Sequence, residues 1–365
     1  MILLIIFIVS FLITLLTIPL TIKLAIKYGL VDNPKLRPHP AHLHKKIVPR
    51  AGGLAIYSAI ILAMLFFLPE EKYLIGIILG ITILLITGIA DDKRSSFNPY
   101  LRLLLVCLSA IVAVLSGIGI SFISNPFYGL NILPSLLSTA FIRFDQIIIP
   151  INFLGQHNLI LISSLFAFLY IVTITQVINW SKGVDGQMPG ITLVTAITLG
   201  LLSLKLYYGG DPNQLSLAKL SFIVAGTSLG FLLFNWHPAK IFPGFSGSTI
   251  LAFMLATLSI LSGAKVATAL LVLAVPAVDF IYTIFRRILS GRSPVWGDRG
   301  HLHHRLLDLG LNHQQISLFY ILVSAILGVI ALLVSSQSKF FGVLMVGIIF
   351  LGFILAINSF LNQKN

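Results

Sequence analysis

Apolar runs, each long enough to cross a lipid bilayer, follow one another along almost the whole chain. Hydrophobic residues make up 57% of the sequence and charged residues 10%, with a mean hydropathy of +1.02. This composition leaves too little polar surface to cover a soluble protein of 365 residues. Since about 20 apolar residues in a helix span the hydrocarbon of a bilayer, the runs predict a single all-α polytopic membrane domain, residues 1–365, with about eleven transmembrane helices. The predicted spans are 2–22, 52–69, 73–90, 103–123, 158–178, 190–208, 217–234, 248–263, 266–285, 315–336 and 340–361.

Basic residues are unevenly distributed between the segments that join these spans. The segments after the odd-numbered spans, together with the C-terminal tail, hold 18 of the 24 Lys and Arg residues. Cytoplasmic loops carry such an excess. We therefore predict a multi-pass protein of the plasma membrane, with its N-terminus outside and its C-terminus in the cytoplasm. The first span lacks a convincing cleavage site and is followed by Lys23 and Lys27, so we expect it to be retained.

The formal charge of +13 mostly reflects this bias. A nucleic-acid partner is unnecessary to explain it, and we expect membrane lipids and substrate phosphates as the anionic partners. The single cysteine, Cys107, falls inside the fourth predicted span. It excludes an internal disulfide and is interpreted as a packing residue.

Two weaker patterns concern packing and the outer surface. Gly76 and Gly80 form a GxxxG pattern in the third predicted span, which would suit the face of a homodimer but is common in membrane helices by chance. The longest external stretch, 124–157, contains the β-branched run IIIPINFLG. We expect this run to form a short hairpin or to lie at the membrane interface.

The polar segments marked by glycine and proline fall on the predicted cytoplasmic side, as do eight of the nine histidines. Five loops that converge on one face favour an active site or substrate vestibule over a scaffold. The five segments are VDNPKLRPHPAHLHKKIVPRAGG, DDKRSSFNPYLR, NWSKGVDGQMPG, FNWHPAKIFPGFSGS and GRSPVWGDRGHLHHRL.

Asp91 and Asp92 are adjacent at the foot of the third apolar run, in a chain with only 11 acidic residues. At a helix terminus both carboxylates can point inward, whereas within a helix they would point about 100° apart. A pair of this kind, together with substrate phosphates, can hold Mg²⁺. The alternative is a solvated turn in which Lys93 and Arg94 are the partners.

Two further loops carry residues that suit anionic ligands. Lys46 and Arg50 precede Gly52-Gly53 at the start of the second span, where backbone N–H groups and the helix dipole attract anions. A basic loop also follows from topology alone. Asn179, Lys182 and Asp185 lie in a glycine-rich turn of a type that suits nucleotides or phosphates.

His301, His303 and His304, flanked by Arg299 and Arg305, form the densest titratable group of the chain. Imidazoles bind metals, donate to phosphates or transfer protons. No cysteine or glutamate completes a zinc ligand set here, so we favour phosphate binding over zinc.

Together and in this order, these loops resemble the polyprenyl-phosphate N-acetylhexosamine-1-phosphate transferase family, which makes the first lipid-linked sugar of cell-envelope polymers such as cell-wall glycans and lipopolysaccharide. The PRAGG and HLHH forms resemble the N-acetylglucosamine branch more than the muramoyl-pentapeptide branch. The matching landmarks are Asp32, His44, Pro49-Arg50, Gly52-Gly53, Asp91-Asp92, Asn179, Asp185-Gly186, Asn235, Pro238 to Phe242, Asp279 and DRGHLHHRLLD at 298–308.

The resemblance implies a reaction in which a polyprenyl phosphate attacks the β-phosphorus of a UDP-sugar, giving polyprenyl-diphospho-sugar and UMP with the help of Mg²⁺. It implies three groups of site residues. Asp91 and Asp92 lie near the lipid phosphate and, with Asp185, are the expected metal ligands. Substrate binding is expected of Lys46, Arg50, Asn179, Lys182, Asp185 and Asn235. The phosphate-binding group is the substrate-binding residue Arg299 with His301, His303 and His304. The three histidines, together with Asp91 and Asp92, are the expected catalytic residues.

The sequence departs from the family pattern at two positions. Phe245 stands where the MGDxGS loop has a metal-binding aspartate, and Lys182 replaces the first aspartate of the NxxDGxDG loop. Relative to the family, Phe245 makes the formal charge of the site more positive by one unit, and Lys182 makes it more positive by two. We therefore hypothesise that Lys182 supplies an ammonium near the diphosphate, so that dependence on Mg²⁺ is altered.

Three alternatives follow from the same residues. A catalytically impaired relative would bind polyprenyl phosphate or UDP-sugar without turnover. A muramoyl-pentapeptide transferase would differ only in its donor. A transporter is disfavoured, because Asp279 is almost the only ionisable residue deep in a predicted span.

Overall fold

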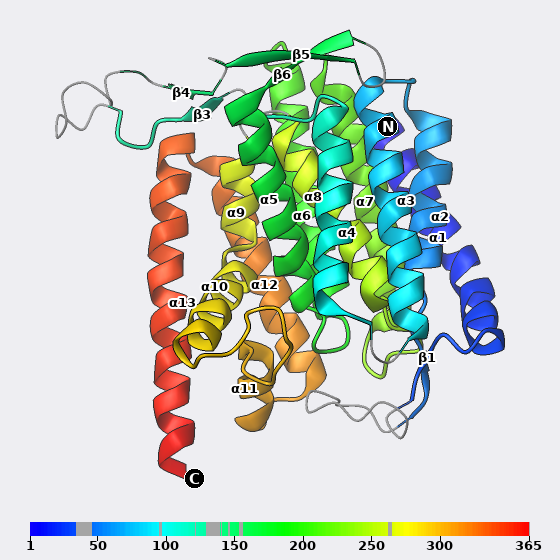
Figure 1. The fold of residues 1–365 in the computed structure, drawn as a ribbon, viewed down its shortest axis with the longest axis vertical. Coiled ribbons are helices and arrows are strands. Elements are labelled where there is room, and N and C mark those ends of the chain that lie inside the picture. Colours follow the sequence, from blue (N-terminus) through cyan, green and yellow to red (C-terminus); the bar gives the residue numbers. More distant parts are fainter. Residues whose placement is uncertain are drawn as a thin grey trace.

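The computed structural model describes residues 1–33, 46–94, 97–120, 122–128, 139, 141–144, 147–152, 156–261 and 265–364. Over these ranges the chain is mainly helical, with three pairs of short strands (Figure 1). The helices are α1 (Ile2–Lys27), α2 (Gly52–Phe67), α3 (Lys72–Lys93), α4 (Pro99–Leu115), α5 (Leu161–Trp180), α6 (Gln187–Tyr208), α7 (Gln214–Asn235), α8 (Gly244–Ile260), α9 (Val266–Val272), α10 (Ala274–Leu289), α11 (Leu302–Asp308), α12 (His313–Leu333) and α13 (Ser336–Lys364). The strands are β1 (Val31–Asp32), β2 (Val48–Pro49), β3 (Phe122–Ser124), β4 (Phe141–Arg143), β5 (Ile148–Asn152) and β6 (Gln156–Ile160).

Every predicted span overlaps a helix of the bundle. Of the helices described, seven are long and apolar enough to cross a membrane, or eight if the bent pair α9–α10 is one span. Helices α2, α4 and α8 are apolar but shorter. The chain is therefore a polytopic helical membrane protein, whereas eleven crossings and the predicted orientation remain predictions. The two termini lie at opposite ends of the bundle (Figure 1).

The ninth predicted span is broken in the structure. Helices α9 and α10 meet at Leu273 with a bend of 78°. Pro276 has no N–H to donate to the carbonyl of Val272, four residues earlier, so a continuous helix would lose that hydrogen bond. Instead, the hydroxyl of Ser324 donates to the Val272 carbonyl at 3.2 Å. The bend directs α10 toward the end of the bundle where α11 lies (Figure 1).

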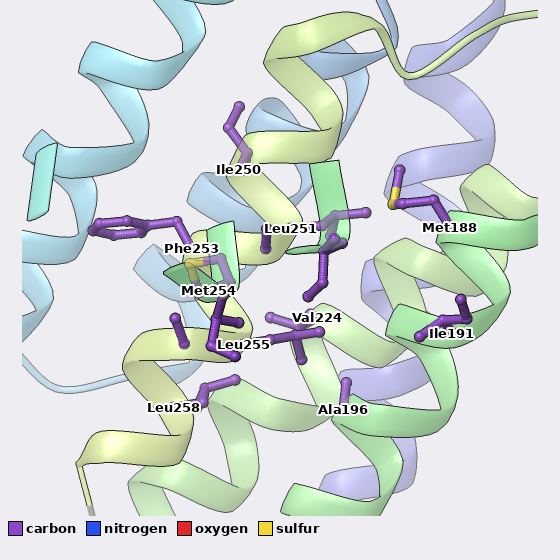
Figure 2. Close-up of a cluster of buried hydrophobic side chains, with 14 of the residues drawn as sticks. Met188, Ile191, Ala196, Val224, Ile250, Leu251, Phe253, Met254, Leu255 and Leu258 are labelled. Carbon is purple, nitrogen blue, oxygen red and sulfur yellow. The ribbon is translucent and has the colours of Figure 1, made fainter. Parts of the chain in front are cut away.

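Helix α8 is the core of the bundle, and all its residues are buried. It packs among α2, α3, α5, α6 and α7. Figure 2 shows its apolar side chains, including Leu251 and Leu255, against side chains of α6 and α7. Small residues allow this close packing, since a Cβ at Gly53 or at Gly88 would collide with Ser246. A helix that is apolar on all sides is stable only when it is enclosed in this way.

The short strands lie at the two ends of the bundle. β1 and β2 pair antiparallel at one end, and the β3–β4 and β5–β6 pairs lie at the other (Figure 1). β5 and β6 pair with Ile148 opposite Ile160, which agrees with the hairpin alternative for the run IIIPINFLG.

The GxxxG pattern serves packing within the chain. Gly76 and Gly80 are both buried, and a Cβ added to them would collide with Ser116 and Phe253 respectively. The glycines thus bring α3 against the end of α4 and against α8. The predicted use of this pattern as a homodimer face is wrong, because that face is already covered.

Candidate functional site

The predicted site residues that the structure describes lie in loops and in helix ends at the end of the bundle that carries β1 and α11 (Figure 1). The landmark His44 lies outside the described residues. Lys46 lies two residues before β2, and its side chain is exposed. Two groups of polar residues at this end contact the loop 181–186.

The first group is the acidic-pair cluster, consisting of Asp91, Asp92, Arg50, Arg102, Lys182 and Phe245. Asp91 and Asp92 occupy the last turn of α3 and are 5% and 0% exposed, so the alternative of a solvated turn is wrong. Asp92 accepts the backbone N–H of Phe245 and the hydroxyl of Ser246, each at 3.0 Å. Its carboxylate thus lies at the N-terminus of α8, where negative charge is stabilised.

Two arginines neutralise the acidic pair. The Arg50 guanidinium lies 3.1 Å from Asp92, 3.7 Å from Asp91 and 3.8 Å from Asp32. Arg102, in the first turns of α4, lies 3.2 Å from Asp91. Arg50 is positioned by a backbone hydrogen bond from its N–H to Leu30. Each carboxylate of the pair therefore has a guanidinium partner.

Gly244 makes this arrangement possible at the start of α8. Its φ of +68° lies in the left-handed region, which a glycine adopts without strain. A Cβ at this position would collide with the Asp92 carboxylate and with the Arg50 carbonyl. The loop before α8 can therefore approach α3 closely only with a glycine here.

Lys182 extends into the same cluster from the loop 181–186. Its ammonium donates to Asn179 Oδ1 at 2.7 Å, and to the Gly244 carbonyl and Ser248 Oγ at 3.1 Å each. Burial, followed by repulsion from Arg50, lowers the pKa of Lys182 from its ordinary value to about 7. A bound anion would raise this pKa again, so we expect anion binding to be accompanied by proton uptake.

Phe245 is 2% exposed, and its ring lies between two cations. Lys182 Nζ is 5.4 Å from the ring centroid, and the Arg102 guanidinium is 5.6 Å from it. Cations within about 6 Å of an aromatic face are attracted to it. The ring thus occupies the position where the family pattern has a carboxylate.

The acidic-pair cluster does not fit Mg²⁺. The ion takes oxygen ligands in octahedral geometry and usually keeps several waters. Here guanidinium, hydroxyl and amide donors engage the acidic pair, and an aromatic ring replaces the third carboxylate. The expected ligands Asp91, Asp92 and Asp185 also do not gather as one group within the described ranges.

Asp185 lies instead among two histidines and a backbone amide. Its carboxylate is 2.7 Å from His237 Nδ1 and 3.7 Å from His313 Nδ1, and it accepts the Ala239 N–H at 3.2 Å. Three ligand atoms of Asp185, His237 and His313 lie within 4.8 Å, close enough to hold a metal. Two nitrogens and one oxygen suit zinc better than magnesium. However, the 2.7 Å contact is a hydrogen bond, and Asp185 N–H donates to His313 Nδ1 at 3.4 Å.

Asn235 holds two loops together. Its Oδ1 accepts the N–H of Gly186 at 3.0 Å, and its Nδ2 donates to the Ile241 carbonyl at 2.9 Å. The side chain is nearly fully buried. Both ends of the amide are thus used by the backbone, so Asn235 positions the loop 181–186, and its predicted substrate contact stays a prediction.

The second group is the imidazole cluster, consisting of His301, His303 and His304. Asp279 on α10 accepts from His301 Nδ1 at 2.9 Å and from the Leu302 N–H at 2.7 Å. With Nδ1 protonated in this way, His301 Nε2 is left as the acceptor. The His301 and His303 rings stack with centroids 5.5 Å apart, and His304 lies 4.4 Å from His303.

The ring nitrogens of this cluster are buried but incompletely bonded. Nδ1 of His303 and Nδ1 of His304 have no hydrogen-bond partner among the described residues. Burial, followed by repulsion from neighbouring groups, lowers the pKa of His304 to about 4 and that of His303 well below its ordinary value. Both imidazoles are therefore neutral at pH 7 and can accept or donate a hydrogen bond to an incoming phosphate.

Arg299 differs from its predicted partners in exposure. It forms a 3.3 Å ion pair with Asp308, and both side chains are about half exposed. Arg299 therefore lies at the rim of the cluster, where it is free to contact a ligand from solvent.

The loop 181–186 joins the two clusters. Lys182 contacts the acidic-pair side, whereas a Cβ on the next residue, Gly183, would collide with the His303 ring. Gly186, with a φ of +82°, ends the loop and precedes α6. The glycine-rich turn identified in the sequence is therefore the point where the two clusters meet.

Several residues of the site were not assigned a role from the sequence. The sequence motifs did not predict the contacts made by Arg102, His237, His313 and Ser246. Asp279 was noted as a landmark, but its hydrogen bond to His301 was not anticipated. The sequence signal for this contact is the position of Asp279, an acidic residue near the end of an apolar run.

Apolar helices with buried charged and imidazole groups at one end define a multi-pass integral membrane protein with a polar site at that end. Residues 74–263 match the model of glycosyl transferase family 4. A Bacillus subtilis protein named probable undecaprenyl-phosphate N-acetylglucosaminyl 1-phosphate transferase is 30% identical over 92% of this chain and 86% of its own. The decaprenyl-phosphate N-acetylglucosaminephosphotransferase of Mycolicibacterium smegmatis is 31% identical over 79% of this chain and 72% of its own. The chain belongs to glycosyl transferase family 4.

The muramoyl-pentapeptide branch is also represented among the relatives. The phospho-N-acetylmuramoyl-pentapeptide-transferase of Endomicrobium trichonymphae is 26% identical over 80% of each chain. The identity with the two N-acetylglucosamine enzymes above is somewhat higher.

Proposed function

We propose that the chain transfers N-acetylhexosamine 1-phosphate from a UDP-sugar to a polyprenyl phosphate, giving polyprenyl-diphospho-sugar and UMP. The names of the relatives support this reaction. The product would be the first lipid-linked sugar of a cell-envelope polymer.

The physical problem in this reaction is the approach of two anions. A phosphate monoester has a second pKa of about 6 and is already largely ionised at pH 7, so it needs little help from a general base. Fixed cations must instead offset the repulsion and stabilise the charge that develops in line. Arg50, Arg102 and Lys182 are buried or half-buried cations of this kind.

The observation that carries the proposal is the junction at the loop 181–186. Lys182 donates into the acidic-pair cluster, and Gly183 lies against His303 of the imidazole cluster. Two phosphate-bearing substrates can therefore be held on either side of one loop. We assign the lipid phosphate to the side of Asp91 and Asp92, the nucleotide to Lys46, Asn179 and Asp185, and the diphosphate to Arg299 and the imidazole cluster.

The reaction is tested by UMP release from the purified protein in micelles that contain polyprenyl phosphate. UDP-N-acetylglucosamine, other UDP-N-acetylhexosamines and UDP-N-acetylmuramoyl-pentapeptide are compared as donors. Turnover that requires the lipid phosphate is expected with an aminosugar donor. Turnover with the pentapeptide donor alone would assign the chain to the other branch.

A second candidate function rests on Phe245 and Lys182, which replace two aspartates of the family pattern. In this alternative the chain binds polyprenyl phosphate or UDP-sugar without turnover. Equilibrium dialysis with radiolabelled UDP-sugar distinguishes the two candidates. Saturable binding without UMP release from any donor would favour the binding protein.

A further inference from the structure

We propose that the Lys182 ammonium is the resident cation of the acidic-pair cluster, and that this chain binds no divalent cation between Asp91, Asp92 and Phe245. The catalytic part of this inference rests on the proposed transfer reaction. The binding part stands on the geometry of the cluster alone.

The first observation is the position of the Phe245 ring. The side chain is buried, and its backbone N–H donates to Asp92 at 3.0 Å. Its ring lies beside both Lys182 and Arg102. An octahedral ion with its waters needs oxygen ligands and space. The ring supplies no ligand and fills the side of the acidic pair where the family pattern has one.

The second observation is the charge balance. Two arginines form ion pairs of 3.1 to 3.8 Å with the nearby carboxylates: Arg50 with Asp32, Asp91 and Asp92, and Arg102 with Asp91. Lys182 brings a third cation to the cluster. With Lys182 protonated, the formal charges of these six groups cancel within the described part of the chain, and an added divalent ion would face a neutral site instead of an acidic one.

The third observation is how Lys182 is held. Its partners are the neutral acceptors Asn179 Oδ1, Ser248 Oγ and the Gly244 carbonyl. None of the three cancels its charge. Ser248 also donates to Asn179 at 2.8 Å, which fixes both acceptors. The ammonium is thus held in place while its charge stays available to a ligand.

The two departures from the family pattern are also linked in charge. Together they add three positive charges, and the absence of a divalent ion removes two. The local formal charge of this chain therefore differs by only one unit from that of a relative that has both aspartates and a bound divalent ion. A lysine over an aromatic ring thus takes the place of a divalent ion and its aspartate ligand.

The test measures binding of Mn²⁺, as a probe of a magnesium site, by electron paramagnetic resonance of the purified protein. All proteins carry His237→Ala, which removes the Asp185–His237–His313 group as a competing ligand set. We expect no stoichiometric binding by this parent. The Lys182→Asp/Phe245→Asp double variant should gain one equivalent of bound ion.

Lys240→Asp is the matched control. Lys240 also lies over a phenylalanine ring, that of Phe234, at 5.8 Å, but its side chain is exposed and outside the cluster. It should bind no more Mn²⁺ than the parent. If the double variant fails to fold, the parent measurement decides alone. One equivalent of Mn²⁺ in the parent that Asp91→Asn removes would overturn the inference.

Turnover supplies an independent readout. UMP release by the wild-type chain should be unchanged after removal of divalent ions with a chelator. Loss of turnover that Mg²⁺ restores would overturn the inference, while leaving the transfer reaction in place. No turnover with any donor would instead contradict the proposed function, and the Mn²⁺ measurement would still decide the question of the cation.

Discussion

The acidic-pair cluster and the imidazole cluster lie on opposite sides of one loop, and they satisfy their polar groups in opposite ways. In the acidic-pair cluster each carboxylate of Asp91 and Asp92 meets a guanidinium. In the imidazole cluster the buried Nδ1 atoms of His303 and His304 lack hydrogen-bond partners within the described residues. A buried polar atom without a partner is costly unless a ligand completes it.

This difference indicates that the two clusters have different roles in the site. The acidic-pair cluster is complete without a ligand and presents fixed positive charge through Lys182 and the two arginines. In the imidazole cluster the His303 and His304 rings are neutral, and a bound group would complete their hydrogen bonding. The first suits electrostatic stabilisation of developing charge, and the second suits recognition of phosphate oxygens.

The largest effect is expected from Lys182→Met, which removes the ammonium but keeps a flexible chain of similar length. If Lys182 stabilises the developing charge, kcat for UMP release should fall by about 10²–10³-fold, with a smaller change in KM. Lys240→Met is the control, since that side chain is exposed outside the cluster. A loss of less than about tenfold would assign the stabilisation to the arginines.

Asp279→Asn tests the imidazole cluster through a positioning residue. The asparagine can still accept the Leu302 N–H through its oxygen, but it offers His301 Nδ1 a donor in place of an acceptor. The ring must then carry its proton on Nε2. We expect kcat to fall by about 10²-fold with little loss of thermal stability.

The readout that separates positioning from folding is the pH profile of kcat, which should shift in Asp279→Asn relative to the wild type. Asp211→Asn, in the turn before α7, serves as the control and should leave the profile unchanged. An unchanged profile in both variants would show that Asp279 acts only on stability.

A smaller effect is expected on stability. The free energy of unfolding should fall more when a buried ion pair is removed than when an exposed one is removed. Arg102→Leu leaves the buried Asp91 with only its more distant Arg50 contact, whereas Arg299→Leu breaks a pair that is about half exposed. We expect Arg102→Leu to cost about 1–3 kcal/mol of unfolding free energy and Arg299→Leu less than about 1 kcal/mol. Thermal unfolding in detergent micelles, followed by circular dichroism, measures both. Equal losses would contradict the view that the acidic pair depends on its guanidinium partners.

Acid should also reduce stability, through a single imidazole. The folded state lowers the pKa of His304 to about 4, against about 6.5 for a free imidazole. Between these values the unfolded chain binds more protons than the folded one, so stability is complete above about pH 6.5 and declines as the pH falls toward 4. His304→Gln should therefore lose less Tm than the wild type between these pH values. A parallel loss in both proteins would contradict the lowered pKa.

Much of the architecture followed from the sequence because long apolar runs must be buried in lipid or protein as helices. The predicted spans overlap helices, and the run 148–160 is the expected hairpin. The break at Leu273 was missed, although Pro276 was visible, because a proline in an apolar run can also be accommodated by a kinked but continuous helix.

The polar residues of the site were easier to identify than their partners. Asp91, Asp92 and the histidines stand out because charged groups are rare in this chain. Arg102 and Phe245 lie 143 positions apart, and only the packing of α3 against both α8 and α4 brings the guanidinium over the ring. Local sequence carries no information on such contacts.

By itself, the sequence determined that the chain is a multi-pass helical protein of glycosyl transferase family 4 and that its polar motifs lie in the loops. Hydrophobic length and motif order depend only on the order of residues, so they are visible before folding. The tertiary structure alone decided that Gly76 and Gly80 pack internally, that Asn235 holds loops, and that Lys182 stands beside the acidic pair. These outcomes depend on which helix faces meet, and that is set by the close packing of distant segments around α8.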